Sequence, residues 1–166
     1  MEIVLAAALL PAIILMVYVY KHDKIEKEPF VLLLTLFAFG ALSCVPAGIL
    51  EDLFSEVLDS MNIQDNQTYY IIMCFGIVAC SEEGAKLFFL KSKTWRCPDF
   101  NYTFDGLLYS VCVGLGFAGL ENIMYVMDYG FGVVISRGLL SVPGHCTFAI
   151  FMGLFYSRAK FHSTYG

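Results

Sequence analysis

Charged residues are scarce in this chain. Only 15% of its 166 residues are Asp, Glu, Lys or Arg, whereas 58% are hydrophobic. Soluble domains have about 25% charged and 45–50% apolar residues, so this composition excludes an ordinary soluble domain. The Lys and Arg residues form short clusters between apolar runs, which excludes the basic surface of a nucleic-acid-binding protein. The sequence therefore indicates a polytopic membrane protein whose surroundings are the lipid bilayer.

We expect neither a disulfide framework nor a cleaved leader. Five of the six cysteines lie within apolar runs and only Cys97 lies in a polar loop, with no C-x-x-C and no zinc-finger spacing. The helical H-E-x-x-H zinc motif is absent as well. The first apolar run starts with Met1-Glu2 and lacks the basic residues of a signal peptide, so we expect it to remain as a helix.

Five apolar segments approach the length of about 20 residues that a membrane span requires. They are residues 3–20, 30–50, 69–90, 104–127 and 131–157. We predict an all-α, polytopic transmembrane helix bundle with about five spanning helices, in a single domain over residues 1–166. Pro143 interrupts the last segment, and we expect a break there, with the part before Ser141 interfacial or re-entrant.

The basic residues of the loops predict an orientation. The first loop, the third loop and the tail are basic, whereas residues 51–68 contain no Lys or Arg. The basic residues are Lys21, Lys24, Lys27, Lys91, Lys93, Arg96, Arg158 and Lys160. Because cytoplasmic loops are enriched in Lys and Arg, we predict a cell-membrane protein with its N-terminus outside and its C-terminus in the cytoplasm.

Two adjacent acids, Glu82 and Glu83, interrupt the third apolar segment. An ionised carboxylate at the bilayer centre costs about 2.5–3.5 kcal/mol even on lenient scales, so these acids indicate a functional site. Lys86 stands four residues after Glu82 and can partly neutralise it, which leaves Glu83 uncompensated within its own helix. Adjacent helix positions diverge by about 100°, so we expect partners from other helices.

Polar residues in the next two segments supply such partners. Glu121, Asn122 and Tyr125 lie in the fourth segment, and His145 follows Pro143 in the fifth. Carboxylates that accept a proton, an imidazole and an amide donor are the components of water-mediated acyl hydrolysis. The same oxygen-rich set could bind a divalent metal ion instead. We expect Arg137 to be an interfacial anchor.

The helix lengths predict a distortion of the bundle. Counted at about 1.5 Å per residue, straight and equally inserted helices would leave Glu83 and Glu121 at different depths. We therefore expect either tilted helices or a segment after Pro98 that dips into the bundle. Small residues at four-residue spacing, Ser110, Gly114 and Ala118, would allow close helix packing in the fourth segment.

The order of these motifs resembles the PrsW family of intramembrane proteases, within the wider CAAX-protease and bacteriocin-immunity superfamily. The matching motifs are Glu82-Glu83-x-x-Lys86, Phe117-x-x-x-Glu121-Asn122-x-x-Tyr125, Arg137, Pro143-x-His145, Gly153 and the segment from Asp23 to Glu28-Pro29. The resemblance implies a hydrolase that makes a first cut in single-pass membrane proteins such as anti-sigma factors, during an envelope stress response.

The resemblance also implies roles for the residues, as a glutamate protease without a cofactor. Glu82 or Glu83 would be the general base, and Glu121 and His145 would hold the water. Three further residues, Asn122, Lys86 and Tyr125, would contact the substrate or stabilise the oxyanion. A metal-dependent mechanism is the alternative, with an ion such as zinc on Glu83, Glu121 and His145.

The chain departs from the family pattern at its end. Family members usually continue into further helices that carry a second histidine, and His162 in the polar tail does not replace it. We expect that the chain is truncated at its C-terminus, that the site is completed in another way, or that activity is weakened. Two other classes stay open: a non-enzymatic membrane immunity or scaffold protein, and an ion or proton transporter.

Overall fold

The computed structural model of this chain describes residues 2–22 and 27–165, so Asp23 and Lys24 of the first loop lie outside the described residues. All regular elements of the described part are helical, which confirms the predicted all-α class. They are α1 (Glu2–His22), α2 (Phe30–Ser60), α3 (Asn66–Ile71), η1 (Ile72–Val78), α4 (Ala79–Thr94), α5 (Thr103–Tyr129), α6 (Val133–Ser136), η2 (Arg137–Ser141) and α7 (Val142–Tyr165), with η1 and η2 π-helical.

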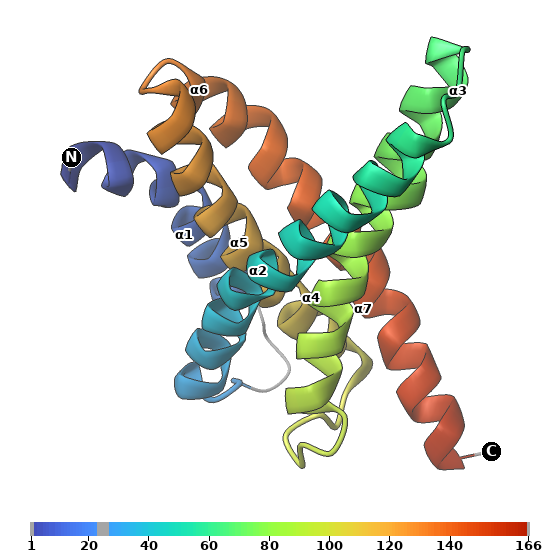
Figure 1. Ribbon diagram of the computed structural model, residues 1–166. Coiled ribbons are helices and arrows are strands. Elements are labelled where there is room, and N and C mark those ends of the chain that lie inside the picture. The colour runs from blue at the N-terminus through green and yellow to red at the C-terminus, as the bar shows by residue number, and fades with distance from the viewer. Residues whose placement is uncertain (1, 23–26, 166) are drawn as a thin grey trace.

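These elements form five helical rods, because α3, η1 and α4 run on without a break, as do α6, η2 and α7 (Figure 1). The rods correspond to the five predicted segments. The predicted break at Pro143 is wrong: the helix continues through it. Proline lacks the N–H that an α-helical register requires, and the π-helical turn η2 shifts the hydrogen-bond register just before it.

Four helices of the described part are long and apolar enough to cross a membrane: residues 5–22, 30–60, 103–129 and 133–162. Helix α2 extends to Ser60, beyond the predicted end at Leu50, and buries Leu58 in its added turns. The rod formed by residues 66–94 is not among the four, and it carries Glu82, Glu83 and Lys86. The four helices are those of a multi-pass membrane protein.

Helix α5 is the centre of the bundle and contacts α1, α2, α4 and α7. The small residues of α5 make the close contact with α7. Ser110 donates a hydrogen bond from Oγ to the carbonyl oxygen of Ala149 (2.7 Å). A Cβ added to Gly114 would lie 2.7 Å from the Cβ of Ala149 and 3.2 Å from the carbonyl oxygen of His145. The predicted packing face therefore sets the position of the helix that carries His145.

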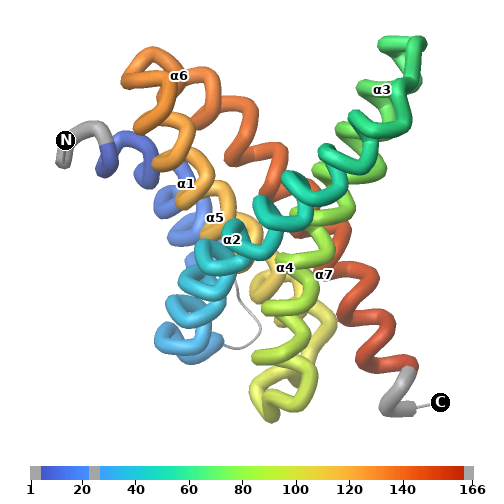
Figure 2. The backbone as a smooth tube through the Cα atoms, in the orientation of Figure 1, coloured from blue at the N-terminus to red at the C-terminus, as the bar shows by residue number. Residues whose placement is uncertain are grey.

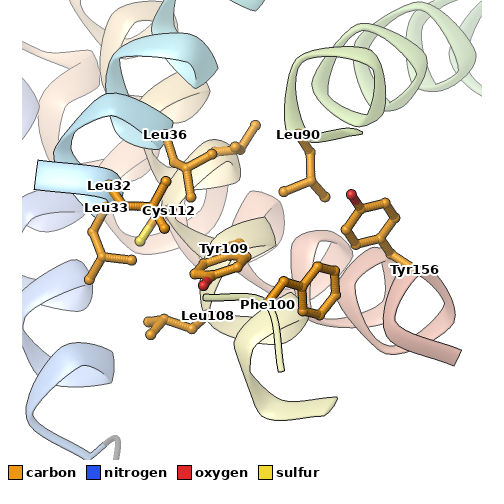
Figure 3. Packing of buried hydrophobic residues seen from close by; sticks show 10 residues of the cluster. Leu32, Leu33, Leu36, Leu90, Phe100, Leu108, Tyr109, Cys112 and Tyr156 are labelled. Atoms are coloured by element: carbon orange, nitrogen blue, oxygen red, sulfur yellow. The ribbon is translucent and has the colours of Figure 1, made fainter. Parts of the chain in front are cut away.

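A hydrophobic cluster joins α2, α4, α5 and α7 at the end of the bundle where α4 ends and α5 begins (Figure 3). Phe100, in the loop after α4, is 3% exposed and packs against Tyr109 and Tyr156, so this loop folds back into the bundle. The hydroxyl of Tyr109 donates a hydrogen bond to the buried carboxylate of Glu28. This contact ties the chain just before α2 to the central helix.

The loops alternate between the two ends of the bundle. The ends of α1, α4 and α7, which carry Lys21, Lys91 and Lys160, lie at one end, and α3 and α6 lie at the other (Figure 2). Lys160 donates a hydrogen bond to the carbonyl oxygen of Trp95 (2.8 Å), so the basic tail contacts the basic third loop. Which end faces the cytoplasm remains a prediction.

Candidate active site

Glu82 and Glu83 meet at one side chain of their own helix. The Lys86 ammonium donates hydrogen bonds to Oε2 of Glu82 (3.1 Å) and to Oε1 of Glu83 (2.7 Å). The expectation that Glu83 is uncompensated within its helix is wrong, because the long lysine side chain reaches acids three and four residues before it. Lys86 is only 1% exposed, so this charge is held inside the bundle.

His145 links these acids to Glu121. Its Nδ1 lies 3.0 Å from Nζ of Lys86 and 3.7 Å from Oε2 of Glu82, and its Nε2 lies 3.0 Å from Oε2 of Glu121. An ammonium has only hydrogens to offer, so Nδ1 accepts from Lys86 and Nε2 carries the proton that is donated to Glu121. One imidazole therefore bridges α4 and α5.

The carboxylates of Glu82 on α4 and Glu121 on α5 reach the same imidazole because the helices are inclined to one another. Figure 1 shows the rod of residues 66–94 crossing α5 and α7 at a steep angle. The π-helical turn η1 lies one turn before Glu82, and π-helical turns occur often at functional sites. The predicted tilt is present, and the loop after Pro98 also folds inward through Phe100.

Arg137 lies in the site, and the expectation that it is an interfacial anchor is wrong. Its guanidinium pairs with Glu121, donates from Nε to Oδ1 of Asn122 (2.8 Å) and contacts Oγ of Ser141 (3.0 Å). The partly buried Glu121 on α5 requires a counter-charge, and η2 places Arg137 beside it. The same guanidinium lies over the ring of Tyr125 (3.7 Å to the centroid).

Both polar atoms of the Asn122 side-chain amide make hydrogen bonds. Its Oδ1 accepts from Arg137, and its Nδ2 donates to the carbonyl oxygen of Ala8 in α1 (3.4 Å). The side chain is 2% exposed. In this arrangement the amide holds Arg137 and α1 in place.

One contributor, Ser141, was missed at the level of sequence, and the contacts of Phe117, a residue of the matching motif, are seen only in the structure. Ser141 lies near Glu121 (3.5 Å) and Arg137, and its spacing of four residues after Arg137 could have identified it. The ring of Phe117 lies under the Lys86 ammonium, with 3.9 Å from Nζ to the centroid, and beside the imidazole of His145. Phe117 occupies the same face of α5 as Glu121, one turn earlier.

A cavity of about 280 Å³ reaches these groups. Glu82 and Glu121 both line it, together with Tyr125, and Asp128 and Glu51 line it farther along α5 and α2. Glu83 is not among its lining residues. Glu82 and Glu121 therefore face one common cavity.

Comparison with known proteins shows the family to which the chain belongs. The model of the PrsW family, described as intramembrane metalloproteases, matches residues 28–166. The chain belongs to the PrsW family. The match includes all the acids of the site, Lys86, Arg137 and His145. Glu28, which accepts the hydrogen bond from Tyr109, stands at its first position.

Curated relatives of this PrsW-family chain are similar over nearly its whole length. It is 32% identical to a protein called Protease PrsW from Oceanobacillus iheyensis, over 98% of this chain and 72% of that protein. It is 29% identical to Protease PrsW of Bacillus subtilis, over 95% of this chain and 69% of that protein. No solved structure matches the chain.

The family description implies a metal ion, so we asked whether the site fits one. One donor atom from each of Glu82, Glu83 and His145 lies within 4.8 Å of the others, so this group differs from the predicted set in having Glu82 in place of Glu121. The Lys86 ammonium contacts all three of these side chains. With Lys86 in this position the three donors do not fit a metal ion, which would need to lie about 2.0–2.2 Å from each.

Proposed function

We propose that this chain is an intramembrane endopeptidase that hydrolyses a peptide bond of single-pass membrane proteins, with a carboxylate of Glu82 as the general base. The observation that carries the proposal is the cavity that Glu82 and Glu121 line together, with His145 between them. The family membership supports the same class of activity. Glu82 is preferred to Glu83 because Glu82 lines the cavity and Glu83 does not.

The proposed reaction follows from the hydrogen-bond network. Glu82 takes a proton from a water molecule in the cavity, and the water oxygen attacks the carbonyl carbon of the substrate peptide. Glu121, held by Arg137 and His145, orients that water. The carbon–nitrogen bond then breaks, and the proton taken by Glu82 passes to the leaving amine. Lys86 holds the carboxylates of Glu82 and Glu83 in place through its hydrogen bonds.

The developing oxyanion is assigned to the Arg137 side of the cavity. The Asn122 amide already donates to Ala8, so it serves to position Arg137 rather than to contact the substrate. Tyr125 lines the cavity and its ring lies against the Arg137 guanidinium, so this positive charge stands behind the lining residues Tyr125 and Glu121. Preorganised charge of this kind stabilises a tetrahedral intermediate.

Several finer features are part of the proposal. The substrate is a single-pass membrane protein such as an anti-sigma factor, which places the activity in a stress response. The subtype is a glutamate protease rather than a metalloprotease, because Lys86 fills the metal-ligand group. The orientation, with the C-terminus in the cytoplasm, follows from the basic loops. Membership of the CAAX-protease superfamily is inferred from the motif order.

A reconstituted cleavage assay tests the proposal. The purified chain is mixed in lipid vesicles with a panel of single-pass reporters that includes an anti-sigma factor, and the fragments are identified by mass spectrometry. We expect a cut in or beside the membrane segment of a reporter, lost in the folded Glu121→Gln variant. Equal cleavage by the variant, or intact reporters throughout the panel, would contradict the proposed function.

A further inference from the structure

The Lys86 ammonium lies where the three candidate metal ligands converge. It donates to Glu82 (3.1 Å) and Glu83 (2.7 Å) and to Nδ1 of His145 (3.0 Å), which uses all three of its N–H donors. Its fourth contact is the face of the Phe117 ring at 3.9 Å. A side chain that is 1% exposed and fully satisfied in this way is a built part of the site.

The same three residues form the group of potential metal ligands, with donor atoms within 4.8 Å of one another. Two carboxylates and an imidazole are donors that a divalent ion accepts. An ion bound to all three must occupy the space that the ammonium now occupies, since both cations would be enclosed by the same atoms. Two like charges in contact also repel strongly away from water.

The charges of the wider site lead to the same conclusion. Glu121 already has its own counter-charge in Arg137, so Lys86 is the cation that compensates Glu82 and Glu83. The three carboxylates of Glu82, Glu83 and Glu121 carry three negative charges, and Lys86 and Arg137 carry two positive ones. With a neutral His145 the site therefore has one net negative charge. A divalent ion added beside Lys86 would make the net charge of the site positive. A divalent ion that replaces Lys86 would instead leave no acid uncompensated.

We propose that Lys86 is a built-in counter-ion that competes with divalent metal ions for Glu82, Glu83 and His145. The ammonium and the metal are alternative occupants of one position. The chain as it stands therefore binds zinc weakly, and removal of the lysine charge turns the same three side chains into a metal site. The inference concerns the site of the proposed function, but its test requires no substrate.

Zinc titration of the full chain in detergent tests the competition. The probe is Zn²⁺ measured by calorimetry, with Co²⁺ absorption as a second signal. We expect Lys86→Met to bind Zn²⁺ about tenfold or more tightly than the unaltered chain. The matched control is Lys93→Met, which removes an exposed lysine from the same helix and should leave the affinity unchanged.

A double variant locates the ion. Adding Glu83→Gln to Lys86→Met should abolish the gain, because it removes one of the three ligands. Equal or weaker Zn²⁺ binding by Lys86→Met, or a gain that survives Glu83→Gln, would overturn the proposal. These outcomes are measured without a reporter, so they are distinct from a failure of the proposed protease activity.

The variant also has a folding readout. Without Lys86, two partly buried acids lose their counter-charge, so Lys86→Met should unfold at a lower temperature in chelator and recover when Zn²⁺ is added. The unaltered chain should show no such shift at the same Zn²⁺ concentration. Failure of both Lys86→Met and Lys86→Gln to fold in the presence of Zn²⁺ would also contradict the proposal, because the ion would then not replace the ammonium.

Discussion

Nε2 of His145 lies 3.0 Å from Oε2 of Glu121, although the two residues stand 24 positions apart on neighbouring helices. The other nitrogen of the same ring contacts Lys86, which holds Glu82 and Glu83. The imidazole thus fixes the distance between Glu82 and Glu121, the two acids of this network that line the cavity.

Replacement of Arg137 by Lys should reduce cleavage by about 100-fold, a loss typical of removing one preorganised electrostatic group. Lysine keeps the charge but cannot contact Glu121, Asn122 and Ser141 with one planar group. The rate of reporter cleavage per folded molecule measures the loss. Arg158→Lys, on an exposed part of α7, is the control, and an equal effect of both changes would rule out a role for Arg137 in the site.

Gly114→Ala should displace His145 by pushing α7 away from α5. The added Cβ would lie 2.7 Å from the Cβ of Ala149, which is too close for either helix to stay in place. We expect a loss of about 1–3 kcal/mol in stability and a fall in the cleavage rate. Thermal unfolding and the cleavage assay measure the two effects.

The control for Gly114→Ala is Gly84→Ala, since a Cβ at Gly84 would meet nothing within 4 Å. Alanine is also the better helix former, so this variant should be unchanged or slightly more stable. If both glycine variants lost stability to the same extent, close packing of α5 on α7 would not be the cause.

Tyr109→Phe should lower the stability without altering the chemistry. The change removes the hydroxyl that donates to the buried carboxylate of Glu28, and a hydrogen bond to a charged group contributes about 1.5–3 kcal/mol to stability. Tyr109 lies roughly 18 Å along α5 from Glu121, so the cleavage rate of folded molecules should stay the same. Tyr70→Phe, at a 63% exposed residue, is the control for thermal unfolding, and an unchanged Tyr109→Phe melting temperature would contradict this account.

Much of the fold and the identity of the site acids could be predicted from sequence. The hydrophobic runs predicted five helical segments, the cost of an ionised acid in the membrane indicated Glu82 and Glu83, and the need for partners from other helices indicated Glu121. The structure shows that His145 contacts two of these groups. These features depend on composition and on the order of the motifs along the chain.

The remaining features depend on how the helices rotate and incline against one another, which periodicity within one helix does not encode. Examples are the hydrogen bond from the Asn122 amide to the carbonyl oxygen of Ala8 and the one from Arg137 to Asn122. The continuation of the helix through Pro143 depends on the π-helical turn before it, which the sequence pattern did not indicate. The spacing places Lys86 within reach of either glutamate, but its contact with both at once depends on the side-chain conformation.

Cleavage of a single-pass reporter in lipid, by the unaltered chain and by Glu82→Gln and Glu83→Gln, tests the central claim that Glu82 activates water without a metal. We predict cleavage that survives a chelator, a loss of about 100- to 10,000-fold in Glu82→Gln, and a smaller loss in Glu83→Gln. Cleavage retained in Glu82→Gln, or cleavage that stops in chelator and returns with Zn²⁺, would contradict the account.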